Sequence, residues 1–580
     1  MNKSAAIAER EVLVETGPPS HGRRRVAGEL TRRGVWALTL AVLAVLVAYP
    51  VARICWLAIS DPATDTFAPS TFIDQLTSST TWAAARNTVV MAGGATVLAV
   101  LAAVPMAWLC VRTNLLLRRQ VTGLVFLTFM CPPILLGLAY ILLFGPTVGL
   151  ATGALHALGV QSTIYSWWGL IFTTTCGSYP IVFMTTAAAL ESLDGDLDNA
   201  AIVHGASTVR TAMRVTLPLV RPAIASGCLL SFVLALNAFG VQALIAIPAR
   251  IPLLTTTIYS YFSYPIQLTP AADQAVLLIA ISLIVTLVVN GYVARRTFPT
   301  IAGKGVRPEI IRLSARGQAA GLALCAMVTG LSIVVPMVII VMSSFARVPG
   351  IGFSPSNLSL DGYRNLIALN DAKIALRNSF VLGILSALGM VVLAISLSYF
   401  RRQNTRGARA AKILAEIPFV IPGIVLAVGL IAAYSRPPVI LYGTFAILVF
   451  AYVAKFLPIA MRFTDNALGQ VAAELEESVY AHGGSRWMAL RMVLIPLIRN
   501  GIVVAGVISF VFAFNELSAS ILLIGNGSQV ASTVLLHYNE EGLLSQMNAF
   551  ATIIFAVTAC CYAVIMRVAG RSLFGSSQAA

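Results

Sequence analysis

Three ionisable residues interrupt long apolar runs, where a charge is costly and therefore marks a candidate functional position. They are Glu416 in "AEIPFVIPG", Lys455 in "AYVAKFLP" and Glu516 in "FAFNELSA". Asn515 precedes Glu516, and Asn237 holds the matching place in "SFVLALNAFG". If these side chains line a pathway, the acid would suit a cationic or metal solute. The alternative is structural: Lys455 pairs with a glutamate inside the protein, or Glu416 lies near lipid headgroups.

The elements that carry these residues are expected to be membrane-spanning helices. The 580 residues are 58% hydrophobic and only 11% charged, whereas soluble proteins carry about 25% charged residues. The net charge of +16 comes from bases in short segments between apolar runs, which is the positive-inside pattern rather than a nucleic-acid surface. We therefore expect an all-α polytopic membrane protein in contact with membrane lipid, with no nucleic-acid partner. The cysteines show no metal-ligand spacing, so no metal site is expected.

A spanning helix needs roughly 20 mostly apolar residues, and twelve segments qualify. Prolines weaken the third ("CPPILLG") and the ninth ("IPGIVLA"). The predicted spans are 35–59, 88–111, 121–144, 165–189, 222–246, 273–294, 318–344, 379–400, 411–434, 439–461, 500–524 and 546–568.

Lysine and arginine in the short loops predict the orientation. The loops after the second and eighth spans, and the segment between the sixth and seventh, are rich in bases, whereas 145–164 has none. Both termini are therefore predicted to be cytoplasmic, in a multi-pass protein of the bacterial cytoplasmic (inner) membrane. We interpret residues 1–34 as a cytoplasmic tail rather than a cleaved signal peptide.

The chain repeats itself. With an offset of 278, residues 203–221 and 481–499 share seven identities in nineteen positions, and "SFVLALNAFG" faces "SFVFAFNELS". A second match aligns "RNTVVMAGG" (86–94) with "RNSFVLGIL" (377–385). We predict two tandem six-helix units, 35–296 (core about 86–295) and 318–570 (core about 377–568). A cytoplasmic linker, 297–317, would join them, and 571–580 would form a C-terminal tail.

The repeated islands lie between the fourth and fifth spans of each unit, on the predicted cytoplasmic side. Acids precede a central glycine and bases follow it, which agrees with the dipole of a short helix. A proline thirteen residues after the glycine suits the first turn of the next helix. An ordinary solvated loop is the alternative, but such a loop would tolerate insertions between the two anchors.

Both islands resemble the EAA loop of type I ABC importer permeases, in which Glu-Ala-Ala precedes a glycine and a later Ile-x-Leu-Pro. "NAA" (199–201) and "ESV" (477–479) hold the leading triplet, so each copy departs from the pattern there. In that family, the loop forms a short coupling helix that docks on the ATPase subunit. The resemblance places these residues at the contact: Asn199, Ala200, His204, Gly205 and Pro218 in the first island, and Glu477, His482, Gly483 and Pro496 in the second.

The resemblance implies a fused, two-repeat permease, closest in layout to ferric-iron permeases, and not an enzyme. It implies two copies of an ABC ATPase subunit and an extracytoplasmic solute-binding protein as partners. The sequence has no GxxxxGK[ST] phosphate loop, so ATP is expected to be used by the partner and no cofactor by this chain. Ferric iron is the expected solute; 2-aminoethylphosphonate, thiamine and polyamine are alternatives. A twelve-span secondary transporter and a channel or scaffold are the rival classes, and neither explains the paired loops.

Overall fold

The structure is a computed structural model that describes residues 33–61, 66–147, 149–152, 157, 163–193, 204–205, 207–296 and 310–573. These residues are helical apart from loops and three isolated β-bridges. Most of the predicted N-terminal tail, of the linker and of the C-terminal tail lies outside this part, as do Asn199 and Ala200.

Nine helices in the described part are long and apolar enough to cross a membrane, and two bent helix pairs raise the number to eleven. The remaining predicted span, the fourth (165–189), corresponds to α8 (Trp167–Ser192), a continuous helix that is not apolar enough to count among them. Threonines 173–175 and Ser178 account for its polarity, and all four are buried. The nine helices are Arg33–Ala58, Ser79–Arg112 (α4), Ala212–Asn237, Leu268–Arg295, Ala315–Ser344, Asn370–Arg402 (α18), Phe445–Gly469 (α21), Arg486–Phe514 and Leu544–Val568.

The third and ninth predicted spans are each broken near the middle by proline. Helices α5 (Arg118–Met130) and α6 (Pro133–Phe144) meet at 100°, and α19 (Ala408–Val420) and α20 (Gly423–Tyr434) meet at 113°. A proline donates no backbone hydrogen bond and pushes the preceding residue out of the helical conformation. The second arms of the two pairs lie in the interior of the protein: most of α6 and every residue of α20 are buried.

The fifth span of each unit is also interrupted, so the continuous helices predicted over 222–246 and 500–524 are wrong in this respect. Helix α11 (Leu217–Asn237) is followed by the short α12 (Phe239–Ile245). In the second unit, α24 (Ile495–Phe514) ends before Asn515, and α25 (Ser520–Leu523) follows. Both breaks occur at the duplicated asparagine, whose amide can bond to carbonyl groups that a helix end leaves free.

Four π-helical turns end two residues before a proline. They are η1 (Ala44–Ala48), η2 (Ala212–Thr216), η3 (Gly330–Val334) and η5 (Ala489–Leu494), before Pro50, Pro218, Pro336 and Pro496 respectively. A proline inside a helix collides with the carbonyl four residues earlier, and a widened turn relieves that contact. The repeat therefore extends to backbone geometry that the sequence pattern did not reveal.

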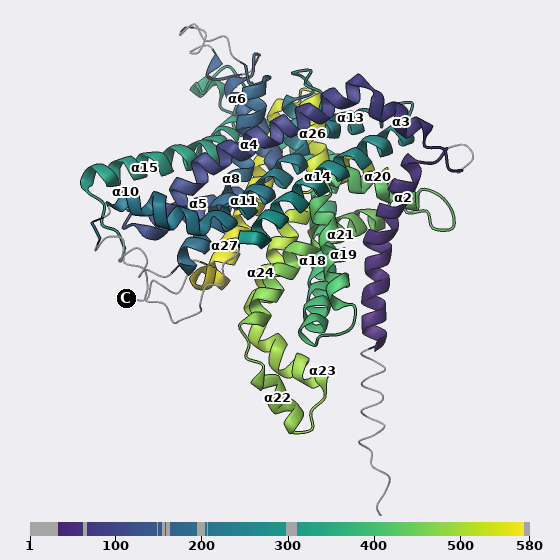
Figure 1. Cartoon of the computed structure of the whole chain (residues 1–580). Helices are drawn as coiled ribbons and strands as arrows, with labels where there is room; N and C mark the ends of the chain where they lie inside the picture. The colour runs from purple at the N-terminus through teal and green to yellow at the C-terminus, as the bar shows by residue number, and fades with distance from the viewer. Residues whose placement is uncertain are drawn as a thin grey trace, which may run out of the picture.

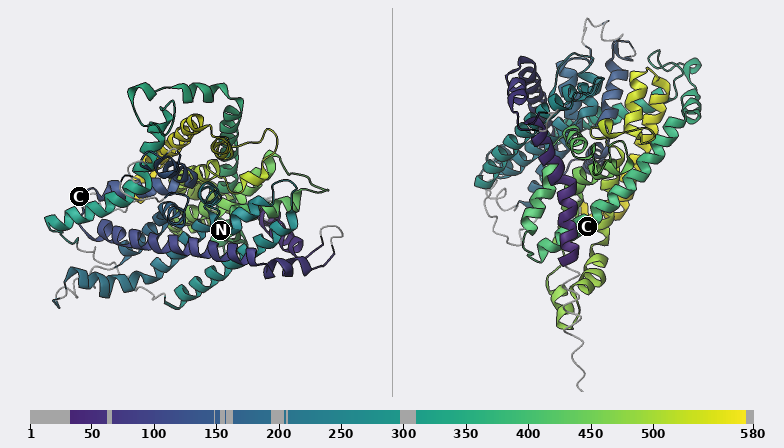
Figure 2. Two further views of the ribbon diagram at one scale, coloured as in Figure 1. Left: turned by 90° about the horizontal axis from the view of Figure 1, so that it is seen from above. Right: turned by 90° about the vertical axis from the view of Figure 1, so that its right-hand side faces the viewer.

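The two units interlock through the first helix of each. Helix α2 (Tyr49–Ala58) of the first unit packs on α20 of the second, and α16 (Val335–Ser344) of the second packs on α6 of the first. Within its own unit, α2 also contacts α14 (Leu268–Arg296), and α16 contacts α27 (Leu544–Leu573). The helix Arg33–Ala58 lies beside the second unit (Figures 1 and 2), where the ring of Trp36 lies 4.8 Å from the ring of Phe400.

Two tyrosines complete this exchange. Tyr434 in α20 donates to the Val45 carbonyl at 2.6 Å, and Tyr140 in α6 donates to the Leu331 carbonyl. Each carbonyl lies in a π turn five residues before a proline, which has no N–H to offer it. A backbone carbonyl in the membrane interior must find another donor. The donor in both cases comes from the other unit.

Six of the short helices occur in matching pairs: Ser70–Thr77 with Asp361–Ala368, Thr208–Thr211 with Arg486–Met488, and Leu254–Ser260 with Ala531–Glu540. Asn87 of the repeated "RN" motif donates to the Pro252 carbonyl at 3.0 Å, and Asn378 donates to the Gln529 carbonyl at 2.9 Å. These bonds hold α4 and α18 against the segments that precede α13 and α26. The short helices are α3 (Ser70–Thr77), α10 (Thr208–Thr211), α13 (Leu254–Ser260), α15 (Ala315–Thr329), α17 (Asp361–Ala368), α22 (Glu474–Ala481), α23 (Arg486–Met488) and α26 (Ala531–Glu540).

Candidate functional site

The second repeated island forms a helical hairpin that projects from the body of the molecule (Figures 1 and 2). Helix α22 carries three glutamates in its first turn, and Gly483 follows it with φ of +77°. Ser485 then caps α23 by accepting a hydrogen bond from the Met488 N–H at 3.2 Å. The sequence predicted one short helix with acids at its start and bases at its end. The bases instead lie beyond the glycine, on the next helix, so only the acids occupy the end of α22 that the helix dipole favours.

The described part of the first island repeats this backbone. Gly205 has φ of +80°, and Ser207 accepts from the Arg210 N–H at 3.4 Å at the start of α10. A π turn and Pro218 follow, as they do at Pro496. Glycine is the residue that takes a positive φ without strain. Neither glycine has an atom within 4 Å of the place where a Cβ would stand, so backbone conformation and not packing explains both.

The polar anchors of the second hairpin differ in exposure. Glu477 and His482 are exposed, and His482 Nδ1 donates to the Ser478 carbonyl at 2.8 Å. The neighbouring Glu476 is buried and forms an ion pair with Arg402 at the end of α18. The structure thus assigns the anchoring role to Glu476, which sequence reasoning passed over. The signals in the sequence were the acid beside Glu477 and a base at the end of the eighth predicted span.

Exposed apolar side chains cover the second hairpin. Trp487 is 65% exposed, Met492 67% and Leu475 45%. In the first island, Met213 is 60% exposed, and His204 and Gly205 are exposed as well. Large exposed apolar side chains beside charged ones are typical of a protein–protein contact. This surface, which we call the hairpin face, has the chemistry of a docking site.

A buried charge network occupies the centre of the second unit. Lys455 on α21 and Glu516 after α24 are 8% and 6% exposed, and Lys455 Nζ lies 2.9 Å from Glu516 Oε1. Glu516 Oε1 also accepts from the Ser518 hydroxyl at 2.7 Å and from the Ala519 N–H at 2.8 Å. Both charges are therefore paired and hydrogen-bonded, which makes their burial tolerable. The structure therefore shows the structural alternative for Lys455, in which it pairs with a glutamate inside the protein.

Other polar residues flagged by the sequence are distributed around this network. Asn237 accepts from the Gly423 N–H at 3.1 Å, which joins the end of α11 in the first unit to the start of α20. A methyl group on Gly423 would overlap the side chains of Lys455 and Ser518 and would stand close to Glu516. The candidates Asn237, Lys455 and Glu516 therefore meet at this glycine. Asn515 instead turns to Thr558 at 3.3 Å. Glu416 lies apart, 45% exposed and 3.7 Å from Lys412.

The first unit has no matching charges. Pro180 in α8 and Pro458 in α21 align the two helices, and this places Gly177 opposite Lys455. Ala238 stands opposite Glu516. Sequence reasoning also missed Asp273 near the start of α14, which is 2% exposed and has no hydrogen-bond partner among the described residues. Its only signal was an acid at the first residue of a predicted span.

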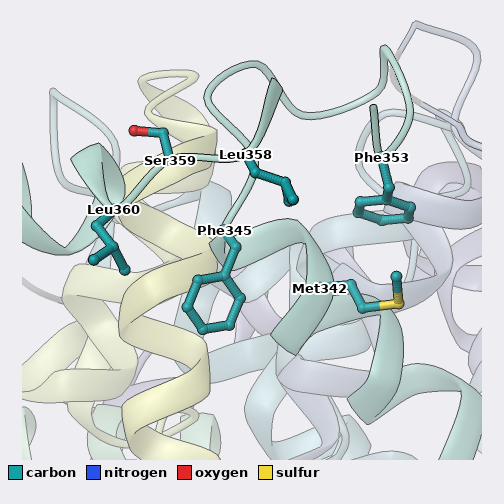
Figure 3. A pocket seen from close by; sticks show the side chains of 6 residues that line it. All are labelled: Met342, Phe345, Phe353, Leu358, Ser359 and Leu360. Carbon is teal, nitrogen blue, oxygen red and sulfur yellow. The ribbon is translucent and has the colours of Figure 1, made fainter. Parts of the chain in front are cut away.

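An apolar hollow of about 620 Å³ opens beside the end of α16. Figure 3 shows its lining from α16 and the following loop: Met342, Phe345, Phe353, Leu358, Ser359 and Leu360. None of these side chains is ionisable, so the hollow does not suit a charged solute. In the described part of the chain, no three His, Cys, Asp or Glu residues gather as metal ligands would.

Comparison with known proteins gives a consistent result. Residues 95–299 and 379–573 match the family described as "Binding-protein-dependent transport system inner membrane component". The chain is 26% identical over 459 residues to the ferric transport system permease protein FbpB of Actinobacillus pleuropneumoniae, covering 77% of this chain and 65% of the relative. It is 25% identical over 479 residues to the putative ferric transport system permease protein FbpB 1 of Haemophilus influenzae, covering 80% of this chain and 74% of the relative.

A shorter relative matches a single unit. The putative 2-aminoethylphosphonate transport system permease protein PhnV of Salmonella typhimurium is 23% identical over 263 residues. This match covers 44% of the chain and 97% of the relative. One unit of the present chain therefore corresponds to the whole of that relative.

Proposed function

The chain belongs to the family of binding-protein-dependent transport system inner membrane components, and we propose that it forms the whole translocation pathway of an ATP-driven importer. It is a multi-pass membrane permease, a transport subunit rather than an enzyme. Permeases of this family work with an ATPase and a solute-binding protein. Because the family pattern occurs twice in one chain, we infer that a single copy supplies both halves of the pathway.

The observation that carries this proposal is the backbone that the two islands share over their described residues. Each has a glycine at positive φ, a serine that caps the next helix, and a π turn before a proline. Two surfaces built alike suit two like partners. We propose that each hairpin docks on one ATPase subunit, that ATP is bound and hydrolysed there, and that both termini and both hairpins are cytoplasmic.

The coupling route follows from the contacts of the second hairpin. Arg402 at the end of α18 forms an ion pair with Glu476 and donates to the carbonyls of Leu468 and Val471. Movement of α22 would therefore act on both α18 and α21. Helix α21 carries Lys455, whose partner Glu516 stands beside Gly423 at the start of α20. We propose that this chain of contacts passes ATPase closure to the centre of the membrane.

Ferric iron is the solute we propose, since two relatives that match more than three quarters of the chain are named for ferric transport. Glu516 is neutralised by Lys455, so no unpaired acid at this centre would select a metal ion. We therefore propose that selectivity rests with the separate binding protein. 2-Aminoethylphosphonate is the second candidate because of the single-unit relative.

Uptake by cells that lack only this chain tests the proposal. We expect accumulation of radiolabelled ferric iron to fall to background and to return with the gene, provided that the ATPase is active. Labelled 2-aminoethylphosphonate, thiamine and a polyamine serve as parallel solutes. If uptake of one of these solutes is lost and iron uptake is not, the proposed solute is wrong but the proposed importer stands. Uptake that persists when the ATPase is inactivated would overturn the ATP-driven mechanism.

A further inference from the structure

A basic pocket lies on the hairpin side of the second unit, away from the central charge network. It is a hollow of about 660 Å³ between the end of α18, the start of α19 and the end of α21. Four cationic side chains line it, together with one acid. They are Arg401, Arg402, Arg409, Lys412 and Asp465.

The acid does not balance these cations. Arg401 and Lys412 share a single oxygen, Asp465 Oδ2, at 3.0 Å and 3.2 Å. Arg409 is exposed and forms no hydrogen bond or ion pair within the described part. Arg402 has its own partner in Glu476. Lys412 also lies 3.7 Å from Glu416, which does not line the hollow. Arg401, Arg409 and Lys412 therefore carry three positive charges against the two carboxylates of Asp465 and Glu416.

The matching place in the first unit is built differently. Leu117 and Gly407 both stand at positive φ immediately before α5 and α19, so the two loops correspond. This alignment places Thr122 opposite Lys412, and the proline alignment of α8 with α21 places Ala187 opposite Asp465. The same loop alignment places Arg119 opposite Arg409, so the first unit keeps that base but has no counterpart of Lys412 or Asp465.

The first loop is also occupied by the chain itself. The Asn114 N–H donates to the Ile311 carbonyl at 3.1 Å, and the Leu313 N–H donates to Asn114 Oδ1 at 2.9 Å. Gln318 donates to the Asn114 carbonyl at 2.9 Å. The same loop therefore differs between the two units. In the first unit it binds the segment between the units, and in the second its bases line an open hollow.

We propose that this pocket binds a phosphate-bearing anion, either the headgroup of an anionic phospholipid or free phosphate. Arginine matches the oxygens of a phosphate group in two-point contacts, and lysine adds a point charge. The pocket lies at the ends of α18 and α21 and the start of α19, which we expect to lie in the membrane. Basic pockets between membrane helices are suited to phospholipid headgroups. A bound phosphate would supply the negative charge that Asp465 alone does not.

Binding to the purified full-length chain tests the proposal without any need for transport. One arm compares native mass spectra after addition of cardiolipin, phosphatidylglycerol or phosphatidylcholine. The other measures thermal stabilisation by inorganic phosphate. We expect Arg409→Gln to weaken anion binding about fivefold, because one basic group near a phosphate surface contributes on that scale. Lys412→Gln provides a second removal of charge from the same pocket.

Arg406→Gln is the matched control, since Arg406 is exposed on the same loop but does not line the hollow. Selective loss of anionic-lipid binding in Arg409→Gln would support the pocket with a lipid as its ligand. Selective loss of phosphate binding would support it with free phosphate as the ligand. Equal weakening by Arg406→Gln, or a wild-type chain that prefers neither anionic lipid nor phosphate, would overturn the proposal.

Discussion

The central pair of Lys455 and Glu516 shows how a charge is kept inside a membrane protein. Both side chains are nearly fully buried, and each oxygen of Glu516 accepts from the Lys455 ammonium at 2.9–3.0 Å. Breaking such a pair by removing one partner leaves a charge uncompensated, whereas replacing both is much less costly. The pair is therefore a poor general source of stability but a strong constraint on how α21 meets the segment after α24.

We predict that Glu516→Gln destabilises the protein by about 3–5 kcal/mol, because Lys455 loses its counter-charge in a buried site. The double variant Lys455→Met/Glu516→Gln should cost clearly less than the sum of the single changes. Thermal unfolding of the purified chain measures all three. Glu477→Gln, on the exposed face of α22, is the control and should change stability by less than about 0.5 kcal/mol. Additive single changes would contradict the pairing.

The same residues bear on transport if the network communicates with the hairpins. We predict that a Glu516→Gln chain that still reaches the membrane transports less solute per ATP hydrolysed. The reason is that Gly423, which touches Glu516 and Asn237, joins the two units at this point. Uptake and ATPase rate measured in the same vesicles give the ratio. A wild-type ratio would assign Glu516 to structure alone.

At the scale of elements, the π turn before a proline recurs in both units and couples them. We predict that Tyr434→Phe destabilises the protein by about 1–3 kcal/mol, since the Val45 carbonyl would lose its donor in a buried place. Tyr140→Phe should act equally through Leu331, because the two bonds are equivalent. Thermal unfolding measures both. Tyr442→Phe, at a half-exposed loop residue with no hydrogen bond from its hydroxyl in the described part, should be neutral.

The second prediction at the scale of elements concerns the hairpins. Gly205→Glu combined with Gly483→Glu should abolish uptake and lower co-purification of the ATPase at least tenfold, because each adds strain at a positive φ and a charge on the docking surface. Gly542→Glu is the control, since this exposed glycine has φ of +72° and open space around it but lies outside both hairpins. Unchanged assembly and transport in the double variant would exclude docking at these surfaces.

At the scale of the whole molecule, the first helix of each unit belongs structurally to the other. Gly429 in α20 makes this possible, because its missing side chain lets the Pro50 carbonyl of α2 approach; a Cβ there would stand 3.0 Å from that oxygen. Small residues at such contacts bring helices close in a membrane, where packing replaces the hydrophobic effect. The segment between the units is therefore not what holds them together.

We predict that the chain split between residues 300 and 301 still assembles when the two parts are co-expressed. Each part expressed alone would leave α6 or α20 uncovered and should be degraded. Affinity purification through a tag on one part measures recovery of the other. Gly429→Leu should lower that recovery several-fold, whereas Gly93→Leu, at a position with open space, should not. Stable parts that fail to co-purify would contradict the exchange of helices.

Much of this architecture could be predicted from the order of residues. Apolar runs longer than a bilayer is thick, bases in the short loops and a repeat with fixed glycine-to-proline spacing are local signals, and they led to an all-α permease of two units. The glycines at 205 and 483 were identified because only a special backbone conformation or a close contact requires glycine twice at one place.

Only the tertiary structure decided the rest, because those features depend on residues far apart in the chain. Lys455 and Glu516 are separated by 61 positions, so the packing of α21 against the segment after α24 decides whether they face a pathway or each other. The same holds for Glu476 rather than Glu477 as the anchor, for the tyrosines that satisfy the other unit's carbonyls, and for a basic pocket made by three helix ends. A buried charge or a proline indicates in the sequence that a counter-charge or a hydrogen-bond donor is needed. Only the packing of the helices determines which residue supplies it.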